Sequence, residues 1–128
     1  ASGAFVGFVG LGVPRVELPF SPCVEIGWRL ARAYWGKGYA HEAARGALQV
    51  GFERLALPEI VAFTAAANRR SERLMQRLGM TADGIFAHPA LPTGHRLCPH
   101  KLYRLSRAAW LGQVMTGEER RLRPIVNL

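Results

Sequence analysis

The sequence predicts a single α/β domain in which helices pack on a β-sheet, and three observations support this prediction. Short apolar runs alternate along the chain with longer stretches of helical periodicity, the order expected of a sheet covered by helices. The 128 residues suffice for one domain with a substantial core. Apolar residues make up 49% of the chain and charged residues 20%, a globular composition that excludes a largely disordered chain.

The first half of the chain predicts two strands and one long helix. Residues 4–11 form an apolar run that predicts a strand. Glycines interrupt this run and no basic segment precedes it, so we expect neither a signal peptide nor a membrane span. Residues 12–22 predict a proline-containing loop, residues 23–30 a second strand, and residues 38–55 a helix. The inward face of this helix is predicted to consist of Ala40, Ala43, Ala44, Ala47, Leu48 and Phe52.

The second half predicts three more strands and a shorter helix. The strands are expected at residues 59–65, 81–87 and 100–106, with a loop at residues 88–99. The helix is expected at residues 69–78, burying Leu74, Met75 and Leu78 and ending at Gly79. Residues 107–128 are expected to add a short helix and a basic tail. We therefore predict a domain at residues 1–110, followed by a basic C-terminal tail at 111–128.

The charge and the cysteine content limit the classes of partner and cofactor. The net charge of +8 favours acidic partners, among them nucleic acid, a ribosome surface or a polyanionic cofactor. Arg69, Arg73 and Arg77 share one helix face, which is typical of a solvated surface. Cys23 and Cys98 lack the spacing of a metal site, so we expect no metal and a reduced, cytoplasmic protein; a disulfide between them is an open alternative.

The most informative motif is the segment VEIGWRLARAYWGKGYAHEAA, residues 24–44. A short apolar run leads into Gly36-Lys37-Gly38, which opens the first predicted helix. Glycines let a ligand approach the backbone, and a helix start offers N–H donors at the positive end of the helix dipole. This combination suits a phosphate or pyrophosphate. The segment is neither a P-loop, because Tyr39 follows Gly38, nor a G-x-G-x-x-G turn, because His41 replaces the third glycine.

A second motif, ANRRSERLMQRLGM, ends at Met80 and contains Asn68 and Ser71 near its start. In this order, the two motifs resemble the acyl-CoA-binding signatures of the GNAT N-acetyltransferases, over about residues 4–110. They are most similar to the branch that acetylates the N-terminal alanine of ribosomal proteins. The segment HPALPTGHRLCPHKLYRLSRAAW also resembles that branch.

The resemblance implies a GNAT fold, with a central, mostly antiparallel sheet flanked by helices, and acetyl-CoA as cosubstrate. The family usually begins with a strand, two helices and a strand that have no counterpart here, so we expect an N-terminally incomplete domain, either a fragment or a late start. An exposed sheet edge would then favour a homodimer. The acceptor is expected to be an amine on a protein N-terminus or a small molecule.

The resemblance also assigns residues to the cofactor. The backbone of Trp28, Arg29 and Leu30 would pair with the pantetheine arm like an added strand. The pyrophosphate turn would comprise Trp35, Gly36, Lys37, Gly38, Tyr39 and Ala40, with Trp35 where the family usually has Gln or Arg. Asn68 resembles a cofactor-binding asparagine, and it is equally well placed to cap the helix.

Two residues are predicted to carry the chemistry. Ser71 resembles the serine proposed to protonate the departing thiolate. Glu25 is predicted to be the general base that takes the amine proton, with His88 or His95 as alternatives. No nucleophile–base–acid triad is present, so we predict direct transfer without an acyl-enzyme.

Two functions of other classes remain open. One is a non-catalytic, CoA-binding regulatory module, which the uncertain base and the missing elements favour. The other is a basic nucleic-acid-binding domain that uses the arginine face and the basic tail; it lacks helix-turn-helix, zinc and RRM-like signatures, and it predicts steeply salt-dependent binding.

Overall fold

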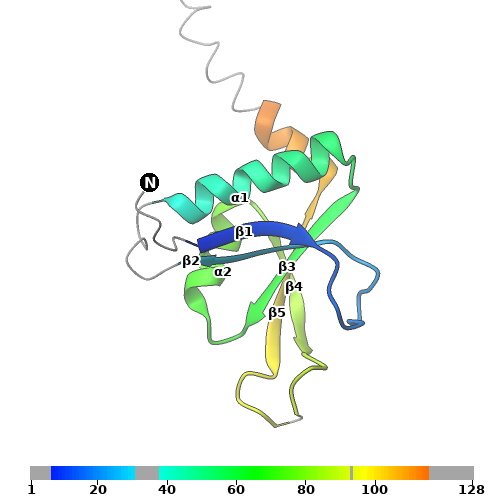
Figure 1. The fold of residues 1–128 in the computed structure, drawn as a ribbon, viewed down its shortest axis with the longest axis vertical. Helices are drawn as coiled ribbons and strands as arrows, with labels where there is room; N and C mark the ends of the chain where they lie inside the picture. Colours follow the sequence, from blue (N-terminus) through cyan, green and yellow to red (C-terminus); the bar gives the residue numbers. More distant parts are fainter. Residues whose placement is uncertain (1–6, 31–37, 93, 116–128) are drawn as a thin grey trace, which may run out of the picture.

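The structure is a computed structural model that describes residues 7–30, 38–92 and 94–115 (Figure 1). The elements are β1 (Gly7–Gly12), β2 (Glu25–Leu30), α1 (Tyr39–Gln49), the π-helical turn η2 (Val50–Arg54), β3 (Glu59–Ala65), α2 (Arg69–Arg77), β4 (Thr81–Ala87) and β5 (Pro99–Ser106). Residues 107–115 are also helical. The order of strands and helices is the one predicted from the sequence.

The five strands form one sheet in the order β1-β2-β3-β5-β4. Every neighbouring pair is antiparallel except β2 and β3, which run parallel. A mixed, mostly antiparallel sheet with helices packed on it confirms the predicted fold class. The parallel pair arises because α1 and η2 form a crossover connection from the end of β2 to the start of β3.

The hydrophobic core lies between one face of this sheet and the helices, and we call this face the helix face. Ile26, Ile60 and Leu105 contribute from the sheet, and Leu48 and Phe52 from α1 and η2. Phe52 has no solvent-exposed surface, and its ring stacks on that of Trp110 at a centroid distance of 5.9 Å. Trp110 belongs to the helical residues 107–115, whose Val114 also packs against this core.

The long predicted helix is divided into α1 and η2. Gly51 lies where the chain passes close to β3: a Cβ at that position would lie only 2.6 Å from Cδ1 of Ile60. Of the predicted inward face, Ala44, Leu48 and Phe52 are buried and Ala40 and Ala47 are partly buried. Ala43 is exposed, so its prediction is wrong; it faces a small surface cavity near the start of α1 instead of the core.

Helix α2 has well-defined ends. The side-chain oxygen of Asn68 accepts a 3.2 Å hydrogen bond from the backbone N–H of Ser71, which makes Asn68 an N-cap. Gly79 follows the helix with φ +82°, a conformation that favours glycine. The predicted burial of Leu74, Met75 and Leu78 is confirmed. The exposed residues of the helix include Arg69, Arg73 and Arg77.

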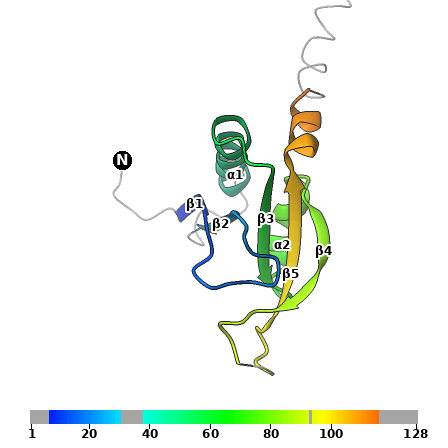
Figure 2. The same ribbon diagram turned by 90° about the vertical axis from the view of Figure 1, so that its right-hand side faces the viewer.

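The opposite face of the sheet, which we call the open face, carries a cluster of aromatic and histidine rings. The loop between β1 and β2 reaches across to β3 and β4 (Figure 2), where Phe20 contacts Phe63 and Phe86 edge-on. The rings of His88 and His100 complete the cluster. Cys23 and Cys98 are both free thiols in the structure. Within the described residues, no helix has the length and apolarity needed to cross a bilayer.

Candidate functional site

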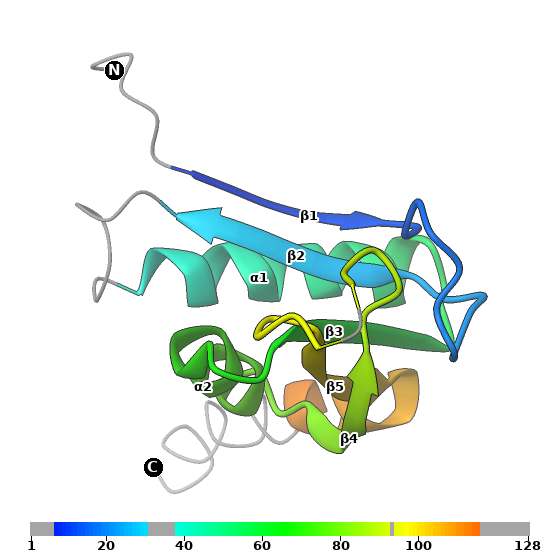
Figure 3. The same ribbon diagram turned by 90° about the horizontal axis from the view of Figure 1, so that it is seen from below.

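The sheet opens between β2 and β3. Glu25 pairs with Val61, and the backbone N–H of Val61 donates a 2.9 Å hydrogen bond to the carbonyl of Val24. Beyond this point the residues of the two strands no longer pair, although β2 continues to Leu30 and β3 to Ala65. Figure 3 shows the strands diverging toward the end of the molecule at which α2 and the start of α1 lie. This edge of β2 therefore offers backbone groups to an extended ligand.

The start of α1 lies at the wide end of the opening. Gly38 is the N-cap with φ +79°, and no side chain there caps the first turn. A Cβ at Gly38 would meet nothing within 4 Å, so a ligand has an unobstructed approach to this turn. The first N–H groups of a helix lack intrahelical acceptors and attract anions. The predicted turn residues Trp35, Gly36 and Lys37 lie outside the described residues, as do residues 31–34.

A side-chain contact joins β2 to α2 across the helix face. The indole Nε1–H of Trp28 donates a 3.2 Å hydrogen bond to Oγ of Ser71, which lies in the first turn of α2. The backbone of Ser71 is held in turn by the cap from Asn68. Because the indole occupies an acceptor position on Oγ, the hydroxyl proton of Ser71 remains available for donation elsewhere.

Glu25 lies at the closed end of the opening and on the open face. Ile26 and Trp28 point to the helix face, so strand alternation directs Glu25 to the other side. Partial burial raises the pKa of the Glu25 carboxyl above its ordinary value of 4.5. A raised pKa makes this carboxylate a better proton acceptor, although its position is several residues from the wide part of the opening.

The three histidines near the hairpin of β4 and β5 differ in their hydrogen bonds. Nδ1 of His88 accepts from the N–H of Ala90 at 3.1 Å, and Nδ1 of His95 accepts from the N–H of Leu97 at 3.0 Å. Nδ1 of His100 lies 3.1 Å from the carbonyl oxygen of Cys98, which can only accept, so this nitrogen carries the proton. Burial, followed by the nearby charge of His100, lowers the pKa of His88.

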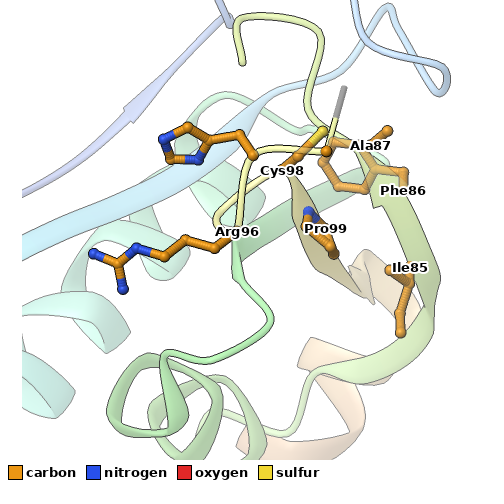
Figure 4. Close-up of a pocket in the computed structure, with 8 residues that line it drawn as sticks. Ile85, Phe86, Ala87, Arg96, Cys98 and Pro99 are labelled. Atoms are coloured by element: carbon orange, nitrogen blue, oxygen red, sulfur yellow. The ribbon is translucent and has the colours of Figure 1, made fainter. Parts of the chain in front are cut away.

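Two surface cavities flank these residues. A cavity of about 130 Å³ brings together β1, the end of β2 and the start of α1; it is lined by Gly7, Phe8, Val9, Trp28, Arg29, Tyr39, Ala40 and Ala43. A larger cavity of about 530 Å³ lies in the hairpin of β4 and β5, lined by Ile85, Phe86, Ala87, Gly94, His95, Arg96, Cys98 and Pro99. Figure 4 shows Arg96 and Ile85 on opposite sides of the larger cavity, which pairs a cationic wall with an apolar one.

The predicted site residues are thus divided among several places in the structure. Trp28, Ser71 and Asn68 meet at the start of α2, while Arg29, Tyr39 and Ala40 join Trp28 at the small cavity. The end of β2 at Leu30 borders the opening, and Glu25 lies apart at its closed end. Sequence reasoning missed His100; strand alternation with Leu102 and Arg104 was the signal that could have indicated its face. Among the described residues, no group of histidine, cysteine or carboxylate side chains has metal-binding geometry.

Comparisons with known proteins place this chain in a family. The sequence profile described as "Acetyltransferase (GNAT) domain" matches residues 1–81, well over half of the chain. The chain therefore belongs to the GNAT acetyltransferases.

Relatives and solved structures agree with this assignment. The chain is 39% identical to the FsC-acetyl coenzyme A-N(2)-transacetylase of Aspergillus fumigatus, over 87% of this chain and 49% of that protein. It is 35% identical to the uncharacterized N-acetyltransferase YnaD of Bacillus subtilis, over 67% of this chain and 50% of that protein. A GNAT-family acetyltransferase structure from Bacillus anthracis matches 80% of this chain and 59% of its own, at 30% identity and a TM-score of 0.66. The chain spans about half the length of these curated relatives.

Proposed function

We propose that this chain binds acetyl-CoA in the opening between β2 and β3 and transfers the acetyl group directly to a primary amine. The observation that carries the proposal is the parallel strand pair that separates after Glu25 and Val61, next to an uncapped helix start at Gly38. Family membership supports the transferase activity, and the name of the Aspergillus fumigatus relative contains acetyl coenzyme A.

The residues present fit the cosubstrate. Its diphosphate would lie at the first turn of α1, where Gly38 leaves the approach open and the helix dipole favours negative charge. Lys37 and Gly36 would complete this turn, with Trp35 as its first residue. The pantetheine arm, which carries amide groups, would pair with the free edge of β2 at Trp28, Arg29 and Leu30.

The start of α2 would serve the departing thiolate. Ser71 lies on the helix face with a hydroxyl that Trp28 orients, so it is the group we expect to donate a proton to sulfur. Asn68 caps the helix through its side-chain oxygen only, so its amide NH₂ group remains a donor for the cosubstrate. Glu25 is the proton acceptor that the sequence predicts; its pKa is raised, but it lies at the closed end of the opening, so the group that accepts the proton is left open at this point.

The acceptor is proposed as a class. A protein N-terminus, as in the ribosomal-protein branch, and a small-molecule amine both present the primary amine that this chemistry needs. The larger cavity, with Arg96 facing Ile85, would suit an acceptor that has both an anionic and an apolar part. We further infer a reducing, cytoplasmic setting from the two free cysteines. We also propose a homodimer that forms through the outer edge of β1, the edge strand of the sheet. A monomer in light scattering would contradict the dimer.

Thiol release from acetyl-CoA tests the proposed function. The purified chain is incubated with acetyl-CoA and a panel of amines that includes alanine-initiated peptides, polyamines and amino acids. Amine-dependent release of free thiol, with an acetylated product in mass spectrometry, is the predicted result. Binding without release for every amine would favour the regulatory module. Absence of binding together with salt-sensitive capture of duplex DNA would favour a nucleic-acid-binding domain.

A further inference from the structure

We propose that His100 accepts the proton of the acceptor amine from the open face of the sheet, beside His88. The inference rests on the proposed function and adds to it a residue that the sequence motifs do not indicate. It also assigns the two proton transfers to the two faces of the sheet. Ser71 would act from the helix face and His100 from the open face, with the opening between β2 and β3 connecting them.

The register places His100 one strand away from the opening, on β5 beside the end of β3. His100 pairs with Ala65, at the end of β3 where β2 and β3 have diverged, and paired residues of an antiparallel ladder point to the same face. Phe63 lies between the paired end of β3 and Ala65, on that same face. Its ring centroid is 6.4 Å from that of His100 and 6.0 Å from that of His88. Both imidazoles therefore contact the ring that borders the opening on β3.

The hydrogen bonds distinguish the basic nitrogen. Because Nδ1 of His100 donates to the Cys98 carbonyl, the neutral ring carries its lone pair on Nε2. No hydrogen bond among the described residues uses that nitrogen. In His88 and His95 the lone pair on Nδ1 already accepts a backbone N–H, so protonation there would break a hydrogen bond. His100 is thus the hairpin histidine prepared to take a proton.

The two imidazoles lie side by side between apolar rings, and we expect the pair to accept one proton during turnover. The His88 ring lies 4.8 Å from that of His100, and its Nε2–H can donate to an acceptor group nearby. The rings of Phe86 and Phe63 supply the apolar walls, and the buried thiol of Cys98 lies 3.9 Å from the carbonyl oxygen of His88. The charged groups that strand alternation and ion pairing place on this face are Glu25 and Arg29 of β2 and the set Glu59, Asp83 and Arg104. Arg96 lies in the hairpin loop, where it lines the larger cavity together with Phe86.

The proton balance of the step closes. An ammonium acceptor gives one proton to Nε2 of His100 and becomes a neutral amine. Its nitrogen forms the bond to the acetyl carbon, and the carbon–sulfur bond breaks. The nitrogen then loses its second surplus proton to solvent. Ser71 delivers its hydroxyl proton to sulfur, so that CoA leaves as a thiol, and the serine takes a proton back from solvent; the net result is release of one proton. The proton on His100 passes to solvent and regenerates the base.

The test is the pH dependence of turnover in His100→Gln. Glutamine keeps a donor for the Cys98 carbonyl but lacks the basic nitrogen. We expect the turnover rate at pH 7 to fall by about 10²-fold, because general bases contribute about 10² to 10⁴. The acidic limb of the rate profile should disappear, while the affinity for acetyl-CoA stays unchanged. In His100→Ala, added imidazole should restore turnover, a rescue that a purely structural role would not give.

Two matched variants sharpen the result. Glu53→Gln changes an exposed residue of η2, outside the proposed site, and should retain both rate and pH profile. Glu25→Gln should retain the acidic limb. An acidic limb that survives in His100→Gln and disappears in Glu25→Gln would overturn the assignment of His100 while the transferase function stands. Wild-type protein that binds acetyl-CoA but releases no thiol with any amine would overturn both.

Discussion

The indole N–H of Trp28 and the hydroxyl oxygen of Ser71, 43 residues apart in sequence, lie 3.2 Å apart in the fold. One residue belongs to the strand that borders the opening and the other to the first turn of α2. The contact therefore fixes the position of α2 relative to β2 at the point where we expect the thioester sulfur. It also explains how a serine in an ordinary first-turn position could act as a proton donor.

Ser71→Ala should lower amine-dependent thiol release by about 10²-fold or more, because it removes the proton donor. Trp28→Phe should lower it by about fivefold, since one neutral hydrogen bond contributes about 1 kcal/mol. Steady-state kinetics would show the loss in the turnover rate, with KM for acetyl-CoA little changed. Ser106→Ala is the control: this serine accepts a hydrogen bond from the N–H of Ala109, on the residues leading into the C-terminal helix. Equal losses in both serine variants would contradict the assigned role.

A second contact between α2 and the sheet predicts a pH dependence of stability. Glu72 accepts hydrogen bonds from Lys101 Nζ at 2.9 Å and from the Tyr103 hydroxyl at 2.8 Å. The bond from Lys101, followed by that from Tyr103, lowers the pKa of Glu72 below its ordinary value of 4.5. The folded state therefore binds the proton less readily than the unfolded state. This stabilisation is present above about pH 4.5 and is lost as the pH falls through the lowered pKa.

Glu72→Gln should consequently melt at a lower temperature than the wild type at pH 7. The two melting temperatures should begin to converge below about pH 4.5 and meet once the pH has fallen through the lowered pKa, where the carboxyl of folded wild type is also protonated. Thermal melts across this range check the prediction. Glu53→Gln, at an exposed position of η2, should follow the wild-type curve throughout. A constant difference between Glu72→Gln and wild type at every pH would argue against the linkage.

The stacked pair of Phe52 and Trp110 predicts where the fold is most sensitive to truncation. Phe52 is fully buried, so Phe52→Ala should lower the free energy of unfolding by about 3–5 kcal/mol. Leu55→Ala, three residues later and 59% exposed, should change it by less than about 0.5 kcal/mol. Urea denaturation followed by tryptophan fluorescence measures both. Similar losses in the two variants would mean that the core is not centred on this stack.

Much of the fold could be predicted from local sequence signals. Alternation in EIGWRL and in EIVAFTA defines two strands, and Gly79 after LMQRL marks the end of α2. The error at Ala43 has a local cause. Helical periodicity indicates an apolar stripe, but a small residue at the edge of the stripe can line a surface cavity equally well.

The site could be predicted only in part, because its contacts are long-range. The motifs indicate Ser71 and Asn68, yet nothing in them indicates that Trp28 donates to Ser71. The role proposed for His100 depends on which carbonyl its Nδ1 meets and on which strand lies beside it. The contact between the rings of Phe20 and Phe63 could not be predicted either, because the sequence of a proline-containing loop does not indicate on which face of the sheet the loop packs.

Calorimetric titration of acetyl-CoA into Gly38→Glu tests the central claim most directly. A glutamate at Gly38 would place a negative charge at the first turn of α1 and force a side chain into a backbone conformation with φ +79°. Gly46→Glu is the matched control, since it lies in the same helix with open space around its Cα. We predict that wild type and Gly46→Glu bind acetyl-CoA alike, whereas Gly38→Glu shows no measurable binding. Equal binding by all three proteins would contradict a cosubstrate site at the start of α1.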